Sequence, residues 1–188
     1  MRTMFLVMLG AALPVALAAQ APQGSCTHRG TAADVARRAS PLDSLQLTID
    51  GAIVKVCYGR PSARGRTMLG GENPFGQPWR LGANEPTRLT LPFAAEVAGV
   101  HVEPGTYSLY VVPQQTSWEV HVNKAVDRWG IPIDSQVQAQ DAGKGTVPVE
   151  TLAQPVEQLT LRLVAGSPAE LVVEWEKTRV RIPIKKTS

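Results

Sequence analysis

The sequence lacks the short motifs that mark several common enzyme classes. It contains no Gly-x-Ser-x-Gly turn for a nucleophilic serine, and Ser62 in RPSARG does not have that frame. The glycine-containing run GRTMLGG lacks the Lys-Ser/Thr pair of a phosphate-binding loop, and no dinucleotide fingerprint is present. These absences give no support to serine hydrolysis, nucleotide hydrolysis or nicotinamide chemistry, and we expect no cofactor.

Metal-ligand spacing is also missing. The chain has three histidines, His28, His101 and His121, and none of them belongs to an HxH or HxxxH pair; no CxxC occurs either. A protein metal site needs several converging ligands with supporting groups around them. We therefore expect no metal site. His121 shares a strand face with Glu119 and Asn123, and we expect it to face solvent.

The charge balance excludes a second group of functions. Nineteen basic and 16 acidic residues give a net charge of +3, which is too small to argue for nucleic-acid or membrane-surface binding. No internal repeat is present, and no amphipathic helix longer than about three turns can be found. The protein is predicted to have one domain.

The first residues have the pattern of a secretory signal peptide. Arg2 precedes an apolar run from Met4 to Ala18 that ends in small residues, and the run is too short and weakly flanked for a stable membrane span. We expect residues 1–18 to be removed before Ala19, leaving 188 − 18 = 170 residues and a net charge of +3 − 1 = +2. The protein is then exported, periplasmic or extracellular, without an integral membrane segment, and no lipid is expected on Cys26.

Only two cysteines are present, Cys26 and Cys57. Export would place them in an oxidising compartment, where they form the only intrachain pair available. In VKVCYG, alternation puts Val54, Val56 and Tyr58 on one face of a strand and Cys57 on the other, where it can reach an N-terminal segment lying across the sheet. We predict a disulfide; two unpaired thiols remain the alternative.

Most of the chain after residue 42 alternates with a period of two, which is typical of half-buried strands. Residues 19–42 are predicted to form an N-terminal arm with a helical turn capped by Thr31, and residues 43–188 to form the domain. No long helix interrupts the pattern, so the fold class is all-β: one antiparallel β-sandwich or jelly-roll-like domain of nine or ten strands. The predicted strands are residues 45–49, 52–59, 88–93, 96–100, 106–112, 117–123, 146–152, 158–164, 170–176 and 178–184, the last two joined as a hairpin at Glu176-Lys177.

One long connection, Tyr58 to Glu85, stands out between two predicted strands. Its glycines and prolines exclude a regular helix or central strand, and its aromatic and aliphatic side chains argue against disorder. We read it as an ordered loop with a cationic face. Its candidate ligand-binding residues are Tyr58, Arg60, Arg66, Trp79, Arg80, Asn84 and Glu85.

Several segments together resemble a known bacterial family, the one catalogued as domain of unknown function 2911. They are Ser40-Pro41, YGRPSARGR, PWRLGANEPT, PGTYSLYVVP, the Trp118 strand with Asn123-Lys124, Asp127-Arg128-Trp129-Gly130 and LVVEWEKTRVRIPI. The resemblance runs from about Ser40 to Ile184. It implies an exported or periplasmic bacterial protein of β-rich architecture, and it implies no activity. Members of the family carry a lipidated Cys or a plain signal peptide at the N-terminus, and this chain looks like the second kind.

Three functional hypotheses remain open. In the first, the protein is a non-enzymatic module whose loop 58–85 binds a small anionic or sugar-like ligand or a cell-envelope partner, with arginine forks for the anion and Trp79 for stacking. In the second, Glu85 or Asp127 acts as general acid or base of a hydrolase in the same cleft. In the third, the protein is purely structural: the arginines bind loop carbonyls, Glu85 pairs with an arginine, and Trp79 closes the end of the core. Trp129 is expected to close one end of the core; the alternative is that it forms a second wall of the pocket opposite Trp79.

Overall fold

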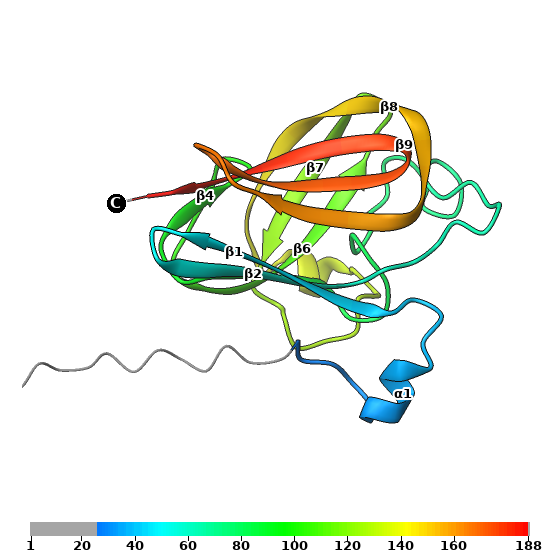
Figure 1. The fold of residues 1–188 in the computed structure, drawn as a ribbon, viewed down its shortest axis with the longest axis horizontal. Helices are drawn as coiled ribbons and strands as arrows, with labels where there is room; N and C mark the ends of the chain where they lie inside the picture. Colours follow the sequence, from blue (N-terminus) through cyan, green and yellow to red (C-terminus); the bar gives the residue numbers. More distant parts are fainter. Residues whose placement is uncertain (1–25, 188) are drawn as a thin grey trace, which may run out of the picture.

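The computed structural model describes residues 26–187, so the predicted signal peptide 1–18 and the first part of the predicted arm lie outside the described residues. The described chain forms two short helices and nine strands (Figure 1). The nine strands belong to one antiparallel sheet. The predicted fold class is confirmed. The elements are α1 (Ala32–Ala36), β1 (Leu42–Ile49), β2 (Ala52–Gly59), β3 (Thr87–Leu91), β4 (Ala95–Val97), β5 (Val100–Val102), β6 (Gly105–Pro113), β7 (Ser117–Asn123), α2 (Ser135–Gln138), β8 (Asp141–Val164) and β9 (Ala169–Lys186). No helix within residues 26–187 has the length and hydropathy needed to cross a membrane.

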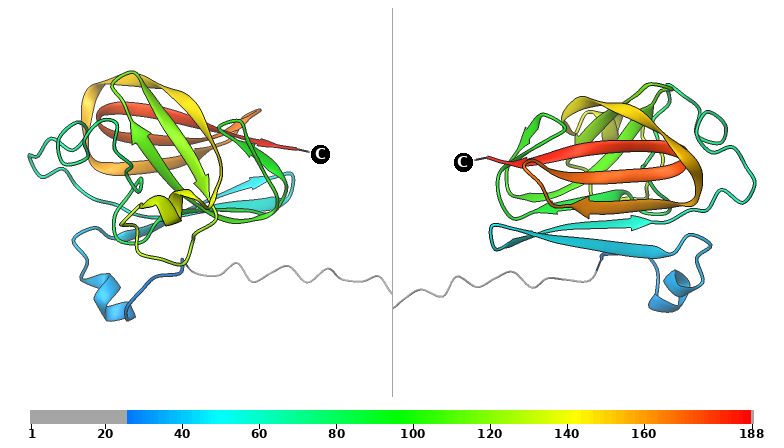
Figure 2. Two further views of the ribbon diagram at one scale, coloured as in Figure 1. Left: turned by 180° about the vertical axis from the view of Figure 1, so that it is seen from behind. Right: turned by 45° about the horizontal axis from the view of Figure 1, so that its top comes forward.

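The sheet folds over on itself into two layers. Its strand order is β1-β2-β3-β6-β7-β8-β9-β4-β5, and it does not close into a barrel. The long strand β8 connects the layers, because residues up to Pro148 pair with β7 and residues from Val149 onward pair with β9. Figure 2 shows β8 and β9 curving across the other strands.

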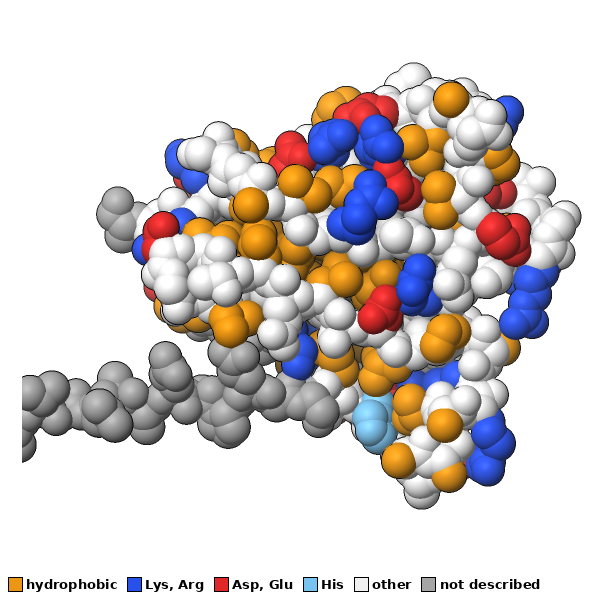
Figure 3. Space-filling view, viewed as in Figure 1, with side chains coloured by type: hydrophobic (Ala, Val, Ile, Leu, Met, Phe, Trp, Pro, Cys, Tyr) orange, Lys and Arg blue, Asp and Glu red, His pale blue; other side chains and the backbone are white. Residues whose placement is uncertain are grey.

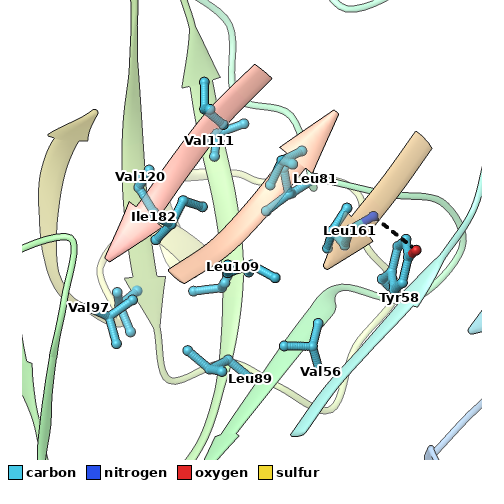
Figure 4. Close-up of a cluster of buried hydrophobic side chains, with 14 of the residues drawn as sticks. Val56, Tyr58, Leu81, Leu89, Val97, Leu109, Val111, Val120, Leu161 and Ile182 are labelled. Atoms are coloured by element: carbon cyan, nitrogen blue, oxygen red, sulfur yellow. Dashed lines mark hydrogen bonds between the residues drawn. The ribbon is translucent and has the colours of Figure 1, made fainter. Parts of the chain in front are cut away.

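Alternating apolar side chains fill the space between the layers. Figure 4 shows Val56, Leu89 and Leu109 from one layer facing Leu161 and Ile182 from the other. Each of these five side chains is at most 1% exposed. Because burial of apolar surface contributes about 25 cal/mol per Å², this interior is the main source of stability.

The predicted C-terminal hairpin is wrong, because β9 is a single strand. The inward-facing positions are odd up to Trp175 and even from Val180 onward. In the structure Glu176 has a positive φ of 51°, and the register with β8 is irregular at this point. A β-bulge shifts the side-chain phase in this way without reversing the chain.

Two further differences concern strand length. The predicted strands 146–152 and 158–164 are parts of β8, whereas the predicted strand 96–100 is a hairpin of β4 and β5.

The bulge at Glu176 also has a structural role, since the Glu176 carboxylate accepts hydrogen bonds from the backbone N–H groups of Met68 and Leu69 at 2.9 and 2.8 Å. Loop 58–85 is thereby attached to β9.

The outer surface of β8 and β9 carries paired charges of both signs (Figure 3). Arg162 and Arg179 both contact the Glu174 carboxylate, whose side chain is 7% exposed. These pairs lower the pKa of Glu174: the hydrogen bond from Arg162 is the largest cause, and it outweighs the effect of burial. These ion pairs form a structural network along β8 and β9.

Strands β1, β2, β3, β6 and β7 form one layer, which we call the first layer. The N-terminal arm lies against its outer face. Thr31 and Asp34 form a reciprocal capping box at the start of α1, as the sequence predicts. Cys26 and Cys57 form a disulfide with a Cα–Cα distance of 5.7 Å, which confirms the predicted pair. Cys57 lies on the outer face of β2, so alternation alone identified the face to which the arm is attached.

We predict that the disulfide stabilises the fold. Its cysteines are 31 residues apart, and a loop of this length corresponds to about 3–4 kcal/mol in the chain-entropy model. Replacing both cysteines with serine should lower the free energy of unfolding, measured by urea denaturation, by about that amount. The wild-type protein treated with a dithiol reductant is the control and should match the variant. Superimposable curves for the variant and the oxidised protein would contradict the prediction.

Candidate functional site

The first residues of loop 58–85 close the edge of a strand. The Tyr58 hydroxyl accepts a hydrogen bond from the backbone N–H of Leu161 at 3.1 Å (Figure 4), and burial is the largest cause of the raised pKa of Tyr58. Arg60 donates to the Leu159 carbonyl and forms a 3.2 Å ion pair with Asp43. Residues 149–164 of β8 no longer pair with β7. Tyr58 and Arg60 therefore supply hydrogen bonds to backbone groups of this part of β8, at Leu161 and Leu159.

Arg66 and Arg80 bind carbonyls of their own loop. Arg66 is exposed and donates to Ala63 and Ser62, whereas Arg80 is half-buried and donates to Gly82. Burial lowers the pKa of Arg80. The two guanidinium groups therefore stabilise the loop locally. They bind different carbonyls, so these bonds do not bring them together at one site.

Trp79 belongs to the core. Its side chain is 6% exposed, stacks on Trp175 at a centroid distance of 5.4 Å and meets Trp118 edge-on at 5.7 Å. A ring buried between two other tryptophans has no free face for a ligand. Of the alternatives left open by the sequence, the structure places Trp79 at the end of the core.

Glu85 is the central anchor of the N-terminal arm. Its carboxylate accepts two hydrogen bonds from the Arg38 guanidinium, at 2.7 and 2.9 Å, and one from the Arg29 backbone N–H at 2.6 Å. Burial alone raises the pKa of Glu85, but the bonds from Arg38 and Arg29 outweigh it, and the pKa lies below its ordinary value. A general acid needs a raised pKa, so the structure does not give Glu85 that property.

The remaining carboxylate of the hydrolase hypothesis, Asp127, lies in solvent. Its side chain is 87% exposed and sits 3.7 Å from the Arg29 guanidinium. It is thus not part of a carboxylate pair with Glu85, which is buried beneath Arg38.

A row of polar side chains crosses the outer face of the first layer. Cys57 pairs in register with Arg88, Arg88 with Ser108, Ser108 with Asn123, and Asn123 with Asp141. Because side chains at paired positions point to the same face of a sheet, these five residues form one line. We call it the polar row.

The polar row holds the arm and the segment 124–140 onto the sheet. Arg88 is 8% exposed and donates to the carbonyls of Thr27, in the arm, and Val126, in the segment. Ser108 donates to the Ala125 carbonyl, and Asn123 donates to the Val137 carbonyl at 2.6 Å. Buried polar groups need hydrogen-bond partners. By covering this face, the arm and the segment supply carbonyl acceptors to the polar row, and the polar row supplies donors to those carbonyls.

His121 is part of a buried cluster beside the polar row, so the prediction that it faces solvent is wrong. It is 7% exposed, stacks on Tyr110 at 4.2 Å, and its ring nitrogens contact Asp141 and Glu119 at 2.8 Å each. Tyr110 also donates to Asp141 at 2.7 Å; burial, followed by this bond, raises the pKa of Tyr110. Asp141 lies 20 residues from His121, and the pattern of one strand could not reveal it.

A depression of about 670 Å³ is formed mainly by segment 124–140, with α2 at one side. Figure 2, left, shows this yellow-green segment below the green strands β6 and β7. The depression is lined by Arg29, Lys124, Ala125, Val126, Asp127, Arg128, Trp129, Ile131, Pro132, Asp134, Gln136, Val137 and Gln140. None of the seven candidate residues of loop 58–85 is among them.

Arg128 is the most unusual residue of the depression. Its Nε donates to the Ala125 carbonyl and its Nη1 to the carbonyls of Trp129 and Gly130, whereas its buried Nη2 has no hydrogen-bond partner in the described part of the chain. Burial lowers the pKa of Arg128. No carboxylate among residues 26–187 lies within ion-pair distance of Arg128 or of the neighbouring Lys124.

Apolar groups are exposed beside these cations. Trp129 is 48% exposed and Ile131 is 59% exposed. The expectation that Trp129 closes one end of the core is therefore wrong, because Gly130 turns the chain and leaves the indole at the surface. Arg38 lies 5.8 Å from the centroid of the Trp129 ring, in cation–π geometry.

Loop 58–85 supports the depression from behind. The Asn84 carbonyl accepts a hydrogen bond from the Gly130 N–H at 2.8 Å. A Cβ atom at Gly130 would lie 2.6 Å from the same carbonyl oxygen and would also collide with Arg80. Arg80, Asn84 and Glu85 thus position segment 124–140, directly or through Arg38, and do not line its depression.

A known protein family matches most of the chain. A family model described as a protein of unknown function, DUF2911, matches residues 40–184. The chain belongs to the DUF2911 family. Neither the curated proteins nor the solved structures compared with this DUF2911 member gave a match. The matched region includes loop 58–85, the polar row and the whole of segment 124–140.

A metal centre finds no support within the described range. No group of three or more His, Cys, Asp or Glu side chains there has the geometry to hold a metal ion. The His121 cluster has two carboxylates, but each already bonds the imidazole, and Asp141 also accepts from Tyr110 and Asn123.

We predict that Glu85→Gln destabilises the protein in a pH-dependent way. The variant leaves the buried Arg38 without its counter-charge and should lower the free energy of unfolding at neutral pH by about 2–4 kcal/mol. Because the folded-state pKa of Glu85 is lowered, its contribution is fully present above the ordinary Glu pKa and is lost as the pH falls through the lowered value.

Urea titrations of the two proteins across acidic and neutral pH test this prediction. The difference between them should shrink on the acid side. Glu72→Gln is the matched control, because Glu72 is an exposed residue of the same loop. A difference that stays constant with pH would contradict the assignment of Glu85 as an ionised anchor.

Proposed function

We propose that this DUF2911 member is an exported, non-enzymatic binding module that holds a small anionic ligand in the depression of segment 124–140. The observation that carries the proposal is Arg128, which lines the depression and whose buried Nη2 has no hydrogen-bond partner within residues 26–187. No described carboxylate lies within ion-pair distance of Arg128, although Asp134 acts on it at longer range. Removing a guanidinium group from water costs free energy that an anion would offset. Lys124, exposed at the same depression, adds a second positive charge.

Three other partly buried arginines have an acidic partner, whereas Arg80 and Arg88 donate to carbonyls as Arg128 does. Arg38 is bonded to Glu85, Arg60 to Asp43, and Arg179 to Glu174. What distinguishes Arg128 among the described arginines is a buried guanidinium nitrogen without a hydrogen-bond partner. Planar guanidinium groups bind carboxylates and phosphates through paired N–H donors, which favours Arg128 as the main contact for an anion. The ligand contact proposed from the sequence for loop 58–85 is therefore transferred to segment 124–140, and the loop is its support.

Three observations support export and binding over the other hypotheses. The disulfide is of a kind that persists in oxidising compartments, in line with the signal-peptide pattern of residues 1–18. For the hydrolase, the Glu85 carboxylate is engaged by Arg38 and Arg29, and the Asp127 side chain is 87% exposed and 3.7 Å from the Arg29 guanidinium. A purely structural role leaves the unpartnered Arg128 without explanation.

We predict that Arg128→Gln removes anion binding and leaves the fold intact. Citrate and inorganic phosphate are the probes, and binding is measured by calorimetry and by the rise in melting temperature that a ligand of the native state produces. Loss of charge-assisted hydrogen bonds should weaken binding by about tenfold to a hundredfold. The dissociation constant should also increase with ionic strength.

Two further variants make the test specific. Lys177→Gln removes a charge from an exposed position of β9 outside the depression and should bind as the wild type does. Arg66→Gln tests the original hypothesis for loop 58–85, because Arg66 also binds only carbonyls. If Arg66→Gln abolishes binding and Arg128→Gln does not, the proposal is overturned in favour of the loop.

A further inference from the structure

The depression has features beyond positive charge, and they restrict the kind of anion that fits it. Its volume of about 670 Å³ is in the range of sites for drug-sized ligands, roughly 300–1,000 Å³. A single inorganic anion occupies a small part of that space. The ligand should therefore carry an anionic group on a larger body.

Trp129 offers that body a flat apolar surface. The ring is 48% exposed, and the neighbouring Ile131 is 59% exposed. Arg38 covers the ring from one side, which holds the indole in place through the Arg38–Glu85 pair beneath it. An exposed, supported indole is suited to stacking against the C–H face of a sugar ring or against an aromatic ring.

The polar groups of the depression include acceptors as well as cations. Asp127 and Asp134 carry exposed carboxylates; Oδ1 of Asp134 caps α2, whereas its Oδ2 accepts no hydrogen bond within the described residues. The amides of Gln136 and Gln140 lie beside them. Such groups accept hydrogen bonds from hydroxyls, but two carboxylates repel a multiply charged phosphate.

We infer that the depression binds an anionic saccharide, a sugar chain whose rings carry carboxylate groups. The inference rests on the proposed function of the depression as an anion site and names its ligand class. In this arrangement Arg128 and Lys124 bind the sugar carboxylate, Trp129 stacks on a ring, and Asp134 with the neighbouring amides accepts hydrogen bonds from hydroxyls. A nucleoside diphosphate also satisfies the first two contacts. Asp127 and Asp134 repel either ligand, but a diphosphate concentrates several negative charges on one group, whereas each sugar ring carries a single carboxylate and is repelled less.

Trp129 is also a built-in reporter for this site. The other three tryptophans, Trp79, Trp118 and Trp175, are between 1% and 6% exposed, so quenching of fluorescence by acrylamide reports mainly on Trp129. A ligand stacked on the indole should protect it from the quencher. The measurement uses the whole mature chain with its disulfide intact.

The experiment compares several probes on the same protein. They are short oligomers of galacturonate, glucuronate and mannuronate, a neutral glucose oligomer of equal length, citrate, triglutamate and a nucleoside diphosphate. We expect at least one uronate oligomer to protect Trp129 and to bind about tenfold or more tightly than the neutral oligomer, because only the uronate gains charge-assisted bonds.

Variants connect the signal to the residues. Arg128→Gln retains the reporter and should lose protection by uronate oligomers by about tenfold or more. Trp129→Ala, followed by calorimetry, should weaken the uronate oligomers but not citrate. Lys177→Gln should match the wild type in both assays. Circular dichroism and melting temperature verify that each variant is folded.

The possible outcomes separate the two proposals. If citrate binds in an Arg128-dependent way and no uronate oligomer protects Trp129, the saccharide inference is overturned while the anion site stands. Preference for triglutamate or for the nucleoside diphosphate overturns the saccharide in favour of that class. Equal binding of the neutral oligomer, or no binding of any probe, overturns the saccharide inference and the anion site together.

Discussion

Buried polar groups on the outer face of the first layer determine how this molecule is assembled. The inner face is an ordinary apolar core, but the opposite face carries Arg88, Ser108 and Asn123, each of which is at most 8% exposed. Such groups are tolerated only if hydrogen bonds replace those made with water. The N-terminal arm and segment 124–140 supply these bonds through backbone carbonyls. Two segments without long helices or strands are thereby fixed on the sheet.

The candidate site follows from this arrangement. Segment 124–140 is held at Ala125, Val126 and Val137, and between these points it turns outward and exposes Trp129. The arm adds Arg29 at the rim and Arg38 behind the indole. A site of this kind is built on irregular backbone but anchored to strands, which limits the freedom of its side chains. The Cys26–Cys57 disulfide fixes the arm at one end, and the Glu85 carboxylate fixes it at the other.

Much of the fold could be predicted from the sequence, because alternation is a local signal. It located most strands and placed Cys57 on the outer face of β2. The bulge at Glu176 could not be predicted, because two residues between alternating runs are equally compatible with a tight turn and with a bulge in one continuous strand. The partners of the site could not be predicted: Arg38 and Glu85 are 47 residues apart and Tyr110 and Asp141 are 31 apart, and nothing in a single sequence connects them. The arginines of loop 58–85 suggested a ligand site, but their number does not show which groups they bind. In the structure they bind loop carbonyls and Asp43.

The location of anion binding tests the central claim most directly. Backbone amide chemical shifts can be followed by nuclear magnetic resonance while citrate is added to the protein. If the account is right, the largest changes occur between Lys124 and Gln140 and at Arg29. Changes concentrated at Arg60 and Arg66, with segment 124–140 unaffected, would contradict it.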